Sequence, residues 1–142
     1  MPLTLRKIRL VLTVAFLLIF VTFMETSSAK RNPTLVEVWV VGDDRLTARL
    51  RDALEDAFKS SPDFRLSSGK KPGTLLVTIP SNVEWKQVGK RTKTLYTIEF
   101  SSVDNQVLGV SKGSCWDDVV MKCANKIVKD ATVVTRRKVS AN

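Results

Sequence analysis

The first 29 residues most limit what this chain of 142 residues can fold into. They begin with the basic residues Arg6, Lys7 and Arg9, continue through an apolar run over residues 10–24, and end in Ser27-Ser28-Ala29. A basic start, an apolar run and small residues in this order predict a secretory signal peptide over residues 1–29. The alternative is a short uncleaved anchor, although a membrane-spanning helix needs about 17 to 25 apolar residues. In both cases we expect the rest of the chain to be exported, either to a periplasm of the Gram-negative type or as a secreted protein.

Without its first 29 residues the chain has 113, enough for one small domain with a single core. We expect a linker over residues 30–34, one domain over 35–134 and a basic tail over 135–142. These 113 residues carry 20 basic and 13 acidic side chains, for a formal net charge of +7. A basic surface outside the cytoplasm favours anionic partners such as lipid, lipopolysaccharide, glycan or an acidic protein face, and nucleic acid is not an expected partner there. The alternative is that the charge serves solubility alone.

Two segments have the periodicity of amphipathic helices. In residues 43–62 apolar positions recur at helical spacing, Asp43 or Asp44 can cap the first amides, and Pro62 ends the pattern. The apolar face of this segment is formed by Leu46, Leu50, Ala53, Leu54, Ala57 and Phe58. Residues 116–134 recover the same period, with lysines opposite the apolar face. We therefore predict two helices that each bury one face.

Alternating and β-branched patterns predict four to five strands around these helices. The predicted strands cover residues 35–41, 64–66, 75–79, 93–101 and 106–111. Residues 80–93 can extend the two neighbouring strands into a long hairpin with Gly89, Lys90 and Arg91 near its tip. The predicted order is β-α-β-β-β-β-α, so we expect an α+β fold in which two helices cover one face of an antiparallel-rich sheet.

This order of elements resembles that of small bacterial envelope domains of the TolB amino-terminal and CsgG type. The resemblance covers most of residues 35–134 and rests on DRLTARLRDALEDAFKSSPDFRL as a helix leading into a strand, YTIEFSSVDNQVLGVSKGS as a late hairpin, and CANKIVKDA in a closing helix. Domains of this type serve assembly and protein contact, so the resemblance implies an accessory role with an envelope protein as partner. The chain differs from many of them in lacking a lipid-attachment cysteine after its apolar run.

The only two cysteines, Cys115 and Cys123, raise two opposing arguments about pairing. An even number of cysteines in a small exported domain favours a disulfide. Within one regular helix, however, eight residues rise about 12 Å, whereas a disulfide needs Cα atoms roughly 4.4 to 6.8 Å apart. A helix that begins at Ser114 excludes the bond, but one capped by Asp117 or Asp118 leaves a preceding loop that can fold back. We predict the disulfide, with the helix starting at one of these aspartates.

The chain contains no histidine, which removes the commonest general base and most zinc and copper ligand sets. This absence also argues against a nucleophilic or redox role for the cysteines. The acidic pairs Asp43-Asp44 and Asp117-Asp118 stand where helices are expected to begin, so we interpret them as caps. We predict no catalytic residue, no metal, no cofactor and no enzymatic activity.

The most suggestive binding surface is the segment WKQVGKRTK, in which basic residues and an aromatic surround a hairpin tip. Its candidate residues are Trp85, Lys86, Lys90, Arg91 and Lys93, joined by Lys70 and Lys71 from the preceding loop. The alternative is that Trp85 packs on the sheet while the lysines protect strand edges. Trp39, opposite the valine face of its strand, is a further candidate for association. The predicted function is protein binding in an envelope assembly, and the alternative is binding of anionic lipid, lipopolysaccharide or glycan by the hairpin.

Overall fold

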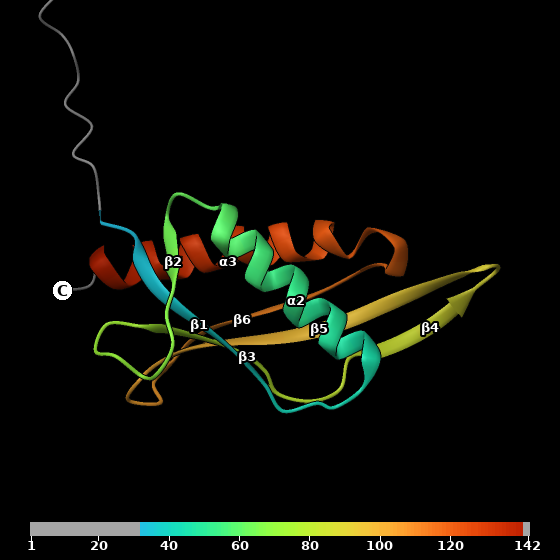
Figure 1. Cartoon of the computed structure of the whole chain (residues 1–142), viewed down its shortest axis with the longest axis horizontal. Coiled ribbons are helices and arrows are strands. Elements are labelled where there is room, and N and C mark those ends of the chain that lie inside the picture. Colours follow the sequence, from blue (N-terminus) through green and yellow to red (C-terminus); the bar gives the residue numbers. More distant parts are fainter. Residues whose placement is uncertain (1–31, 141–142) are drawn as a thin grey trace, which may run out of the picture. The chain divides into compact units, whose positions relative to one another are not determined.

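The computed structural model describes residues 32–140, and the predicted signal peptide lies outside them. Figure 1 shows a twisted sheet with two helices, and the elements are labelled as in that figure. In chain order they are β1 (Thr34–Val40), α2 (Arg45–Ser60), β2 (Phe64–Leu66), β3 (Leu75–Ile79), β4 (Glu84–Val88), β5 (Arg91–Ser102), β6 (Val107–Trp116), the 3-10 turn η1 (Asp117–Val119) and α3 (Val120–Ser140). The predicted α+β class with two helices is confirmed.

The sheet has six strands, more than the four to five predicted, because residues 84–88 form a strand of their own. β1 pairs in parallel with β2 on one side and with β3 on the other. β5 pairs antiparallel with β3, β4 and β6. β6 occupies one edge of β5 along most of its length. β3 and β4 therefore share the other edge of β5, one after the other.

Both helices pack on the same face of the sheet, as predicted. Side chains alternate between the faces of a strand, and Val36, Val77 and Phe100 share one buried core with residues of α2 and α3. The largest fully buried side chains of that core are Phe58, Phe100, Leu50, Leu54, Ile79, Ile98 and Ile127. The other face of the sheet therefore has no helix over it within residues 32–140; we call it the open face.

The loop over residues 67–74 crosses part of the open face. β2 and β3 lie on the two sides of β1, so the chain between them has to pass over β1. The Gly69 amide donates to Glu37 Oε1 at 3.2 Å, and Lys70 Nζ lies 4.7 Å from the centre of the Trp39 ring. Glu37 and Trp39 alternate with the core-facing valines of β1, so this crossing lies on the side away from the helices.

A strand break over residues 80–83 separates β3 from β4 along the edge of β5. Thr78 pairs with Glu99 and Glu84 pairs with Leu95, so five residues on one side oppose three on the other. The two extra residues keep β3 and β4 from forming one continuous strand. The chain leaves the sheet plane here and returns as the hairpin.

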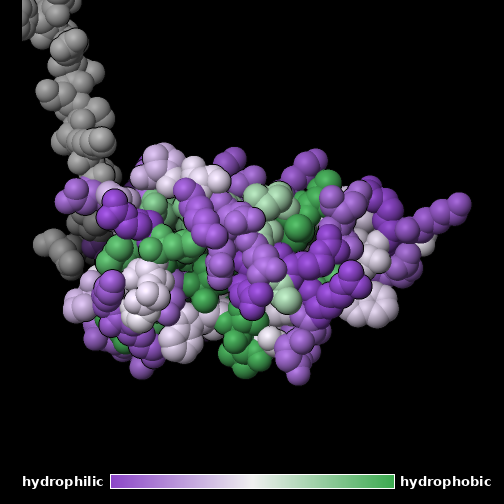
Figure 2. Space-filling model, viewed as in Figure 1, coloured by the Kyte–Doolittle hydropathy of each residue, from purple (hydrophilic) through white to green (hydrophobic). Residues whose placement is uncertain are grey.

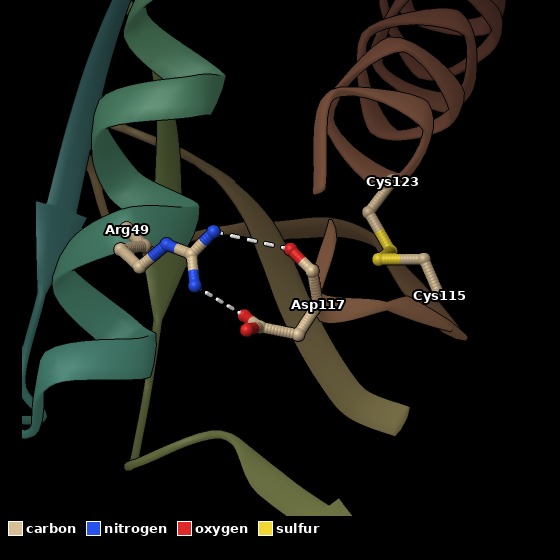
Figure 3. Close-up of a disulfide and its surroundings, with 4 residues drawn as sticks. All are labelled: Arg49, Cys115, Asp117 and Cys123. Atoms are coloured by element: carbon tan, nitrogen blue, oxygen red, sulfur yellow. Dashed lines mark hydrogen bonds and ion pairs between the residues drawn. A yellow bond between two sulfur atoms is a disulfide. The ribbon is translucent and has the colours of Figure 1, made fainter. Parts of the chain in front are cut away.

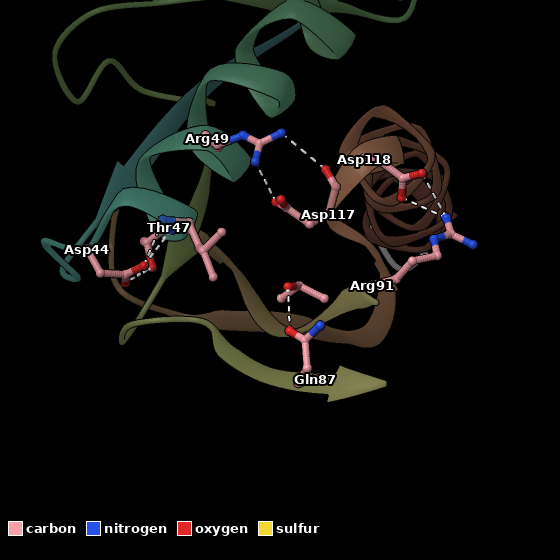
Figure 4. Close-up of polar contacts among 9 residues, drawn as sticks. Asp44, Thr47, Arg49, Gln87, Arg91, Asp117 and Asp118 are labelled. Atoms are coloured by element: carbon pink, nitrogen blue, oxygen red, sulfur yellow. Dashed lines mark hydrogen bonds and ion pairs between the residues drawn. The ribbon is translucent and has the colours of Figure 1, made fainter. Parts of the chain in front are cut away.

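The amino-terminal end of α2 holds this break in place (Figure 4). Asp44 caps the helix by accepting from the Leu46 and Thr47 amides at 2.8 and 3.0 Å. The hydroxyl of Thr47, a fully buried residue, donates to the same carboxylate and accepts from the Val83 amide at 2.9 Å. Asn82 adds a second link, since its Oδ1 accepts from the amide of Asp43 at 2.9 Å.

The predicted disulfide is confirmed and joins β6 to the beginning of α3 (Figure 3). The Cα atoms of Cys115 and Cys123 lie 5.8 Å apart. Helical structure begins at Asp117, as predicted, but its first residues form the turn η1 before α3 proper. The predicted loop before the helix is wrong, because β6 continues as far as Trp116 by pairing with Lys93 and its neighbours in the long strand β5.

The carboxy-terminal helix is also longer than predicted. α3 continues to Ser140, whereas residues 135–142 were expected to form a solvated tail. No proline or glycine interrupts the sequence there, and the Thr135 hydroxyl donates to the Ala131 carbonyl at 3.1 Å within the helix. Residues 135–140 therefore extend α3 with a largely exposed, basic last turn.

Replacing Thr47 by Val tests the link between α2 and the strand break. The substitution keeps the shape but leaves the buried Val83 amide without its acceptor, so we expect about 1 to 3 kcal/mol lower free energy of unfolding. Thr47→Ser keeps the hydroxyl and should lose less. Urea denaturation of both variants beside the wild type measures the difference, and equal losses in the two variants would contradict the hydrogen-bond account.

The stability of the wild type and of Thr47→Val should also depend differently on pH. The hydrogen bond from Thr47 holds the pKa of Asp44 below its ordinary value, despite the opposing effect of burial. A depressed folded-state pKa contributes stability above the unfolded pKa of about 3.9, and that stability is lost as the pH falls through the folded value. The stability gap between wild type and Thr47→Val should therefore be widest near neutral pH and narrow below about pH 4.

Removing the disulfide should loosen one end of α3 more than the rest of the domain. The bond closes a loop between residues eight apart, for which loop entropy gives about 2 to 3 kcal/mol of stabilisation. In the double variant Cys115→Ala, Cys123→Ala we expect a loss of that size, with amide exchange faster over residues 113–123 than in β1 and β3. Exchange that quickens uniformly would argue that the bond constrains the whole fold instead.

Candidate functional site

The open face presents most of the exposed apolar side chains of residues 32–140. Five of the nine exposed large hydrophobic residues lie on the open side of strands: Trp39, Val88, Leu95, Val107 and Val110. Val110 is 52% exposed on β6, where it pairs with Glu99, and Leu95 is 37% exposed on β5, where it pairs with Ser114. Polar residues of the same face, Thr97 and Lys112, separate Leu95 from Val110, so the exposed apolar side chains alternate with polar ones.

A hollow of about 430 Å³ lies on this face beside the strand break. Leu95 and Thr97 of β5 lie between its two walls, which are residues 81–84 of the break and residues 112–114 of β6. Glu84 on one wall and Lys112 on the other give the hollow charges of both signs. Its lining thus mixes apolar and polar groups, which is also the composition of many protein-binding surfaces.

The predicted hairpin exists and projects beyond the rest of the sheet (Figure 1). Gly89, with φ of 61°, and Lys90 form a two-residue turn, and glycine at the first position is the type II′ pattern. Every residue from 84 to 91 is exposed, and the projecting end is largely hydrophilic (Figure 2). Across the hairpin, the Thr92 hydroxyl donates to Gln87 Oε1 at 3.0 Å. Lys86 and Lys90 are thus presented to solvent.

Arg91, a predicted binding residue, is engaged with the beginning of α3 instead (Figure 4). Its Nη2 donates to both carboxylate oxygens of Asp118, at 2.7 and 2.9 Å, and its guanidinium lies 4.3 Å from the centre of the Trp116 ring. The hydrogen bond from Arg91 holds the pKa of Asp118 below its ordinary value. The charge of Arg91 is therefore largely neutralised within the chain.

The acidic pair at the start of α3 does not cap the helix, which corrects our interpretation of it. The turn η1 has no side-chain cap, and Asp117 and Asp118 point to different arginines. Arg49 of α2 donates to Asp117 Oδ1 at 2.6 Å and to the carbonyl oxygen of the same residue at 3.1 Å (Figure 3). Arg49 lies 68 residues before Asp117, and Arg91 lies 27 residues before Asp118. The two carboxylates therefore connect elements that are far apart in the sequence.

The remaining hairpin residues are divided between two faces. Trp85 is 63% exposed and pairs with Thr94, on the opposite side of the hairpin from Lys86. The alternative that Trp85 packs on the sheet is therefore wrong. Lys86 pairs with Lys93, which in turn pairs with Trp116, so these three side chains form a row on the open face.

The loop lysines do not join the hairpin. Lys70 and Lys71 precede β3, whereas the hairpin tip follows β4, and Figure 1 shows the two at opposite ends of the sheet. Lys70 instead lies over Trp39, the other predicted binding residue. The predicted set therefore forms two surfaces, one at the hairpin and one on β1.

Sequence reasoning missed the hollow and its neighbours on the open face. Leu95 and Val110 occupy outward positions in strands that were otherwise expected to be polar outward. These two apolar residues at outward positions were the sequence signal from which an exposed apolar surface could have been predicted. No local sequence pattern predicted the strand break, because the break depends on a hydrogen bond between Thr47 and Val83, which lie far apart in the sequence.

Two further features of residues 32–140 bear on chemistry and location. No group of three or more histidine, cysteine, aspartate or glutamate side chains in this part of the chain is arranged to hold a metal ion. None of the helices that the structure describes combines the length and apolar character needed to cross a bilayer.

Neither the protein-family models nor the curated proteins contain a match to this sequence. Solved structures do match in fold. A Xanthomonas campestris protein of the DUF330 family aligns with a TM-score of 0.60 at 8% identity, covering 82% of this chain and 93% of that one. Dodecameric PelC of Paraburkholderia phytofirmans aligns with a TM-score of 0.53 at 11% identity over 68% of this chain and 84% of its own. A minor lipoprotein of Acinetobacter baumannii aligns with a TM-score of 0.50 at 10% identity, over 75% and 94%.

These similarities establish a shared fold among bacterial proteins, one of which is a lipoprotein. They support the predicted resemblance at the level of a small bacterial envelope domain. They do not single out the TolB amino-terminal or CsgG type. At identities of 8 to 11% the matches describe the architecture of this chain and leave its residues to be interpreted on their own.

Proposed function

We propose that this chain is an exported, non-enzymatic interaction domain that binds a protein partner of the bacterial envelope through the open face of its sheet. The observation that carries the proposal is the set of uncovered apolar side chains on the open face: Leu95, which lines the hollow, and Val107 and Val110 on β6. Both helices are used on the other face, so within residues 32–140 nothing else covers these side chains. Burial against a partner would remove them from water, which is the main source of affinity in protein association.

Three observations support a place in the envelope. The amino-terminal sequence has the layout of a signal peptide. The disulfide between Cys115 and Cys123 belongs to an oxidising compartment. The same fold occurs in a lipoprotein, and in PelC it occurs in a dodecamer, so the architecture is compatible with life outside the cytoplasm and with assembly from several subunits.

The open face favours a protein over a purely anionic ligand. Its apolar side chains alternate with charges of both signs, among them Glu84 and Lys112. The alternative proposal is that the hairpin binds anionic lipid, lipopolysaccharide or glycan. Arg91 is paired with Asp118, so only Lys86 and Lys90 remain as projecting cations for such a ligand. The same experiment separates the two.

Substituting Val110 by Lys places a charge on the open face, on the edge strand β6. The full-length chain with a carboxy-terminal tag is crosslinked in cells of the source organism, and the proteins recovered with it are identified and then titrated in purified form. We expect the affinity for the partner to fall at least about tenfold, because the substitution buries a charge in an apolar contact. The complex should depend little on salt.

Val133→Lys is the matched control. Val133 is 47% exposed on α3, close to the 52% of Val110, and the added charge is the same. This variant should bind like the wild type. A partner that both variants lose or both retain would refute the open face as the site. Loss of an anionic lipid or glycan on Lys86→Ser with Lys90→Ser, with no protein recovered from any sample, would favour the hairpin.

A further inference from the structure

A second pocket lies where the end of β6 meets the first turn of α3, and it shares Tyr96 and Ser114 with the open-face hollow. Its volume is about 310 Å³, and it adjoins the disulfide. The residues of its wall that concern us are Lys93, Tyr96, Ser114, Trp116, Lys122 and Lys126. They come from β5, β6 and α3, so the pocket exists only in the folded chain.

The charge of this pocket is positive and only partly neutralised. Lys126 Nζ donates to Asp130 Oδ2 at 2.7 Å. Neither Lys93 nor Lys122 forms an ion pair with another residue of the 32–140 region. The nearby Asp118 binds Arg91 and, more weakly, feels the charge of Lys122, so it compensates that lysine only in part. Two ammonium groups around a concave surface concentrate positive potential there.

Tyr96 supplies a polar group that lacks a partner. Its side chain belongs to a residue only 4% exposed, and its buried hydroxyl has no hydrogen bond among the described residues. The neighbouring Ser111 hydroxyl donates to Asp130 at 2.5 Å. Burial raises the pKa of Tyr96, so its hydroxyl keeps its proton at neutral pH. Buried hydroxyls in proteins are nearly always paired; Ser111 is the nearest group to this one, and an acceptor that enters from the pocket side can pair with it.

Gly113 makes room for this tyrosine. It pairs with Tyr96 across the two strands, and a Cβ at position 113 would lie 2.5 Å from the Tyr96 hydroxyl oxygen. Glycine there lets the phenol ring pass over β6 toward the edge of the sheet, where the pocket lies. The flat Trp116 side chain, already covered by Arg91, forms another part of the wall.

We propose that this pocket binds a phosphate group, held by Lys93 and Lys122 with Tyr96 as a hydroxyl donor. Lysine binds phosphate as a point charge, whereas a carboxylate is better matched by the planar fork of arginine, and the only arginine at this site is engaged. The phosphate belongs either to a lipid headgroup or to a free phosphate compound. The site shares two residues with the open-face hollow, but Lys93 and Lys122 do not line that hollow, so substituting Lys122 tests this site apart from the proposed protein-binding face.

Sodium phosphate is the first probe, titrated into the isotope-labelled full chain with sodium chloride at equal ionic strength as reference. We expect saturable changes in the amide signals of residues 114–126 with phosphate alone. Lys122→Gln should weaken the apparent affinity about fivefold, since one charge-assisted contact is lost. Tyr96→Phe should weaken it as well, with unchanged spectra elsewhere in the core.

Lys129→Gln is the matched control, because Lys129 is exposed on the same helix and does not line the pocket. It should bind phosphate within about twofold of the wild type. Equal weakening by Lys122→Gln and Lys129→Gln would mean a diffuse charge effect and overturn the proposal, as would identical shifts with chloride. Lys122 and Lys129 are both exposed, so neither substitution should unfold the chain. The spectra report directly whether each variant is folded.

Vesicles separate the two sources of the phosphate. Phosphatidylglycerol vesicles that bind the wild type, release it on addition of sodium phosphate and fail to bind Lys122→Gln would identify a lipid headgroup. Phosphate-dependent shifts without vesicle binding would identify a free phosphate compound. Both results support the pocket. Vesicle binding that Lys122→Gln leaves intact, together with no saturable phosphate shifts, would overturn it.

Discussion

The rest of this domain depends on one long strand, β5, that pairs with three other strands. This strand, Arg91–Ser102, pairs with β6 along one edge and with β3 and then β4 along the other. Because β3 and β4 share an edge, the chain between them has to leave the sheet and return. That detour produces the strand break, the hollow beside it and the hairpin that projects beyond the core.

A second constraint is that two helices cover only one face of a six-stranded sheet. Leu50, Leu54 and Phe58 of α2 and Ile127 of α3 fill the core on that face. The crossing loop covers part of β1 on the other face through Glu37 and Lys70, and leaves β5 and β6 exposed there. The apolar residues in outward register on β5 and β6 are therefore the features that packing within residues 32–140 does not explain, and the proposed partner rests on them.

The sequence predicted what depends on neighbouring residues. The helix over residues 43–62 was recognisable because its apolar spacing, its acidic cap and Pro62 all lie within the segment, and the structure has α2 at Arg45–Ser60. The hairpin tip followed from Gly89 in the same way. The disulfide followed from the even number of cysteines in an exported domain, and a helix start at Asp117 or Asp118 followed from the distance that the bond requires; the structure has the start at Asp117 but a strand in place of the expected loop.

What the sequence could not predict depends on residues far apart in the chain. The role of Arg91 depends on Asp118, 27 residues later, and the break depends on Thr47, 36 residues before Val83. The extension of β6 to Trp116 depends on the length of β5, since Gly113 and Ser114 favour a strand only weakly. The site was misread for the same reason: sequence proximity grouped Arg91 with Lys86 and Lys90, whereas tertiary contacts give it a structural partner.

The junction of β6 and α3 shows how such contacts combine into a site. Three ties meet there: the disulfide, the pair of Arg49 with Asp117 and the pair of Arg91 with Asp118. The ion pairs are exposed to solvent, and exposed pairs contribute about 0 to 1 kcal/mol each. The covalent bond is therefore the dominant tie, and it fixes the first turn of α3 against β6. Lys122 precedes Cys123 directly, so the same bond that closes the junction also sets where this lysine faces the pocket.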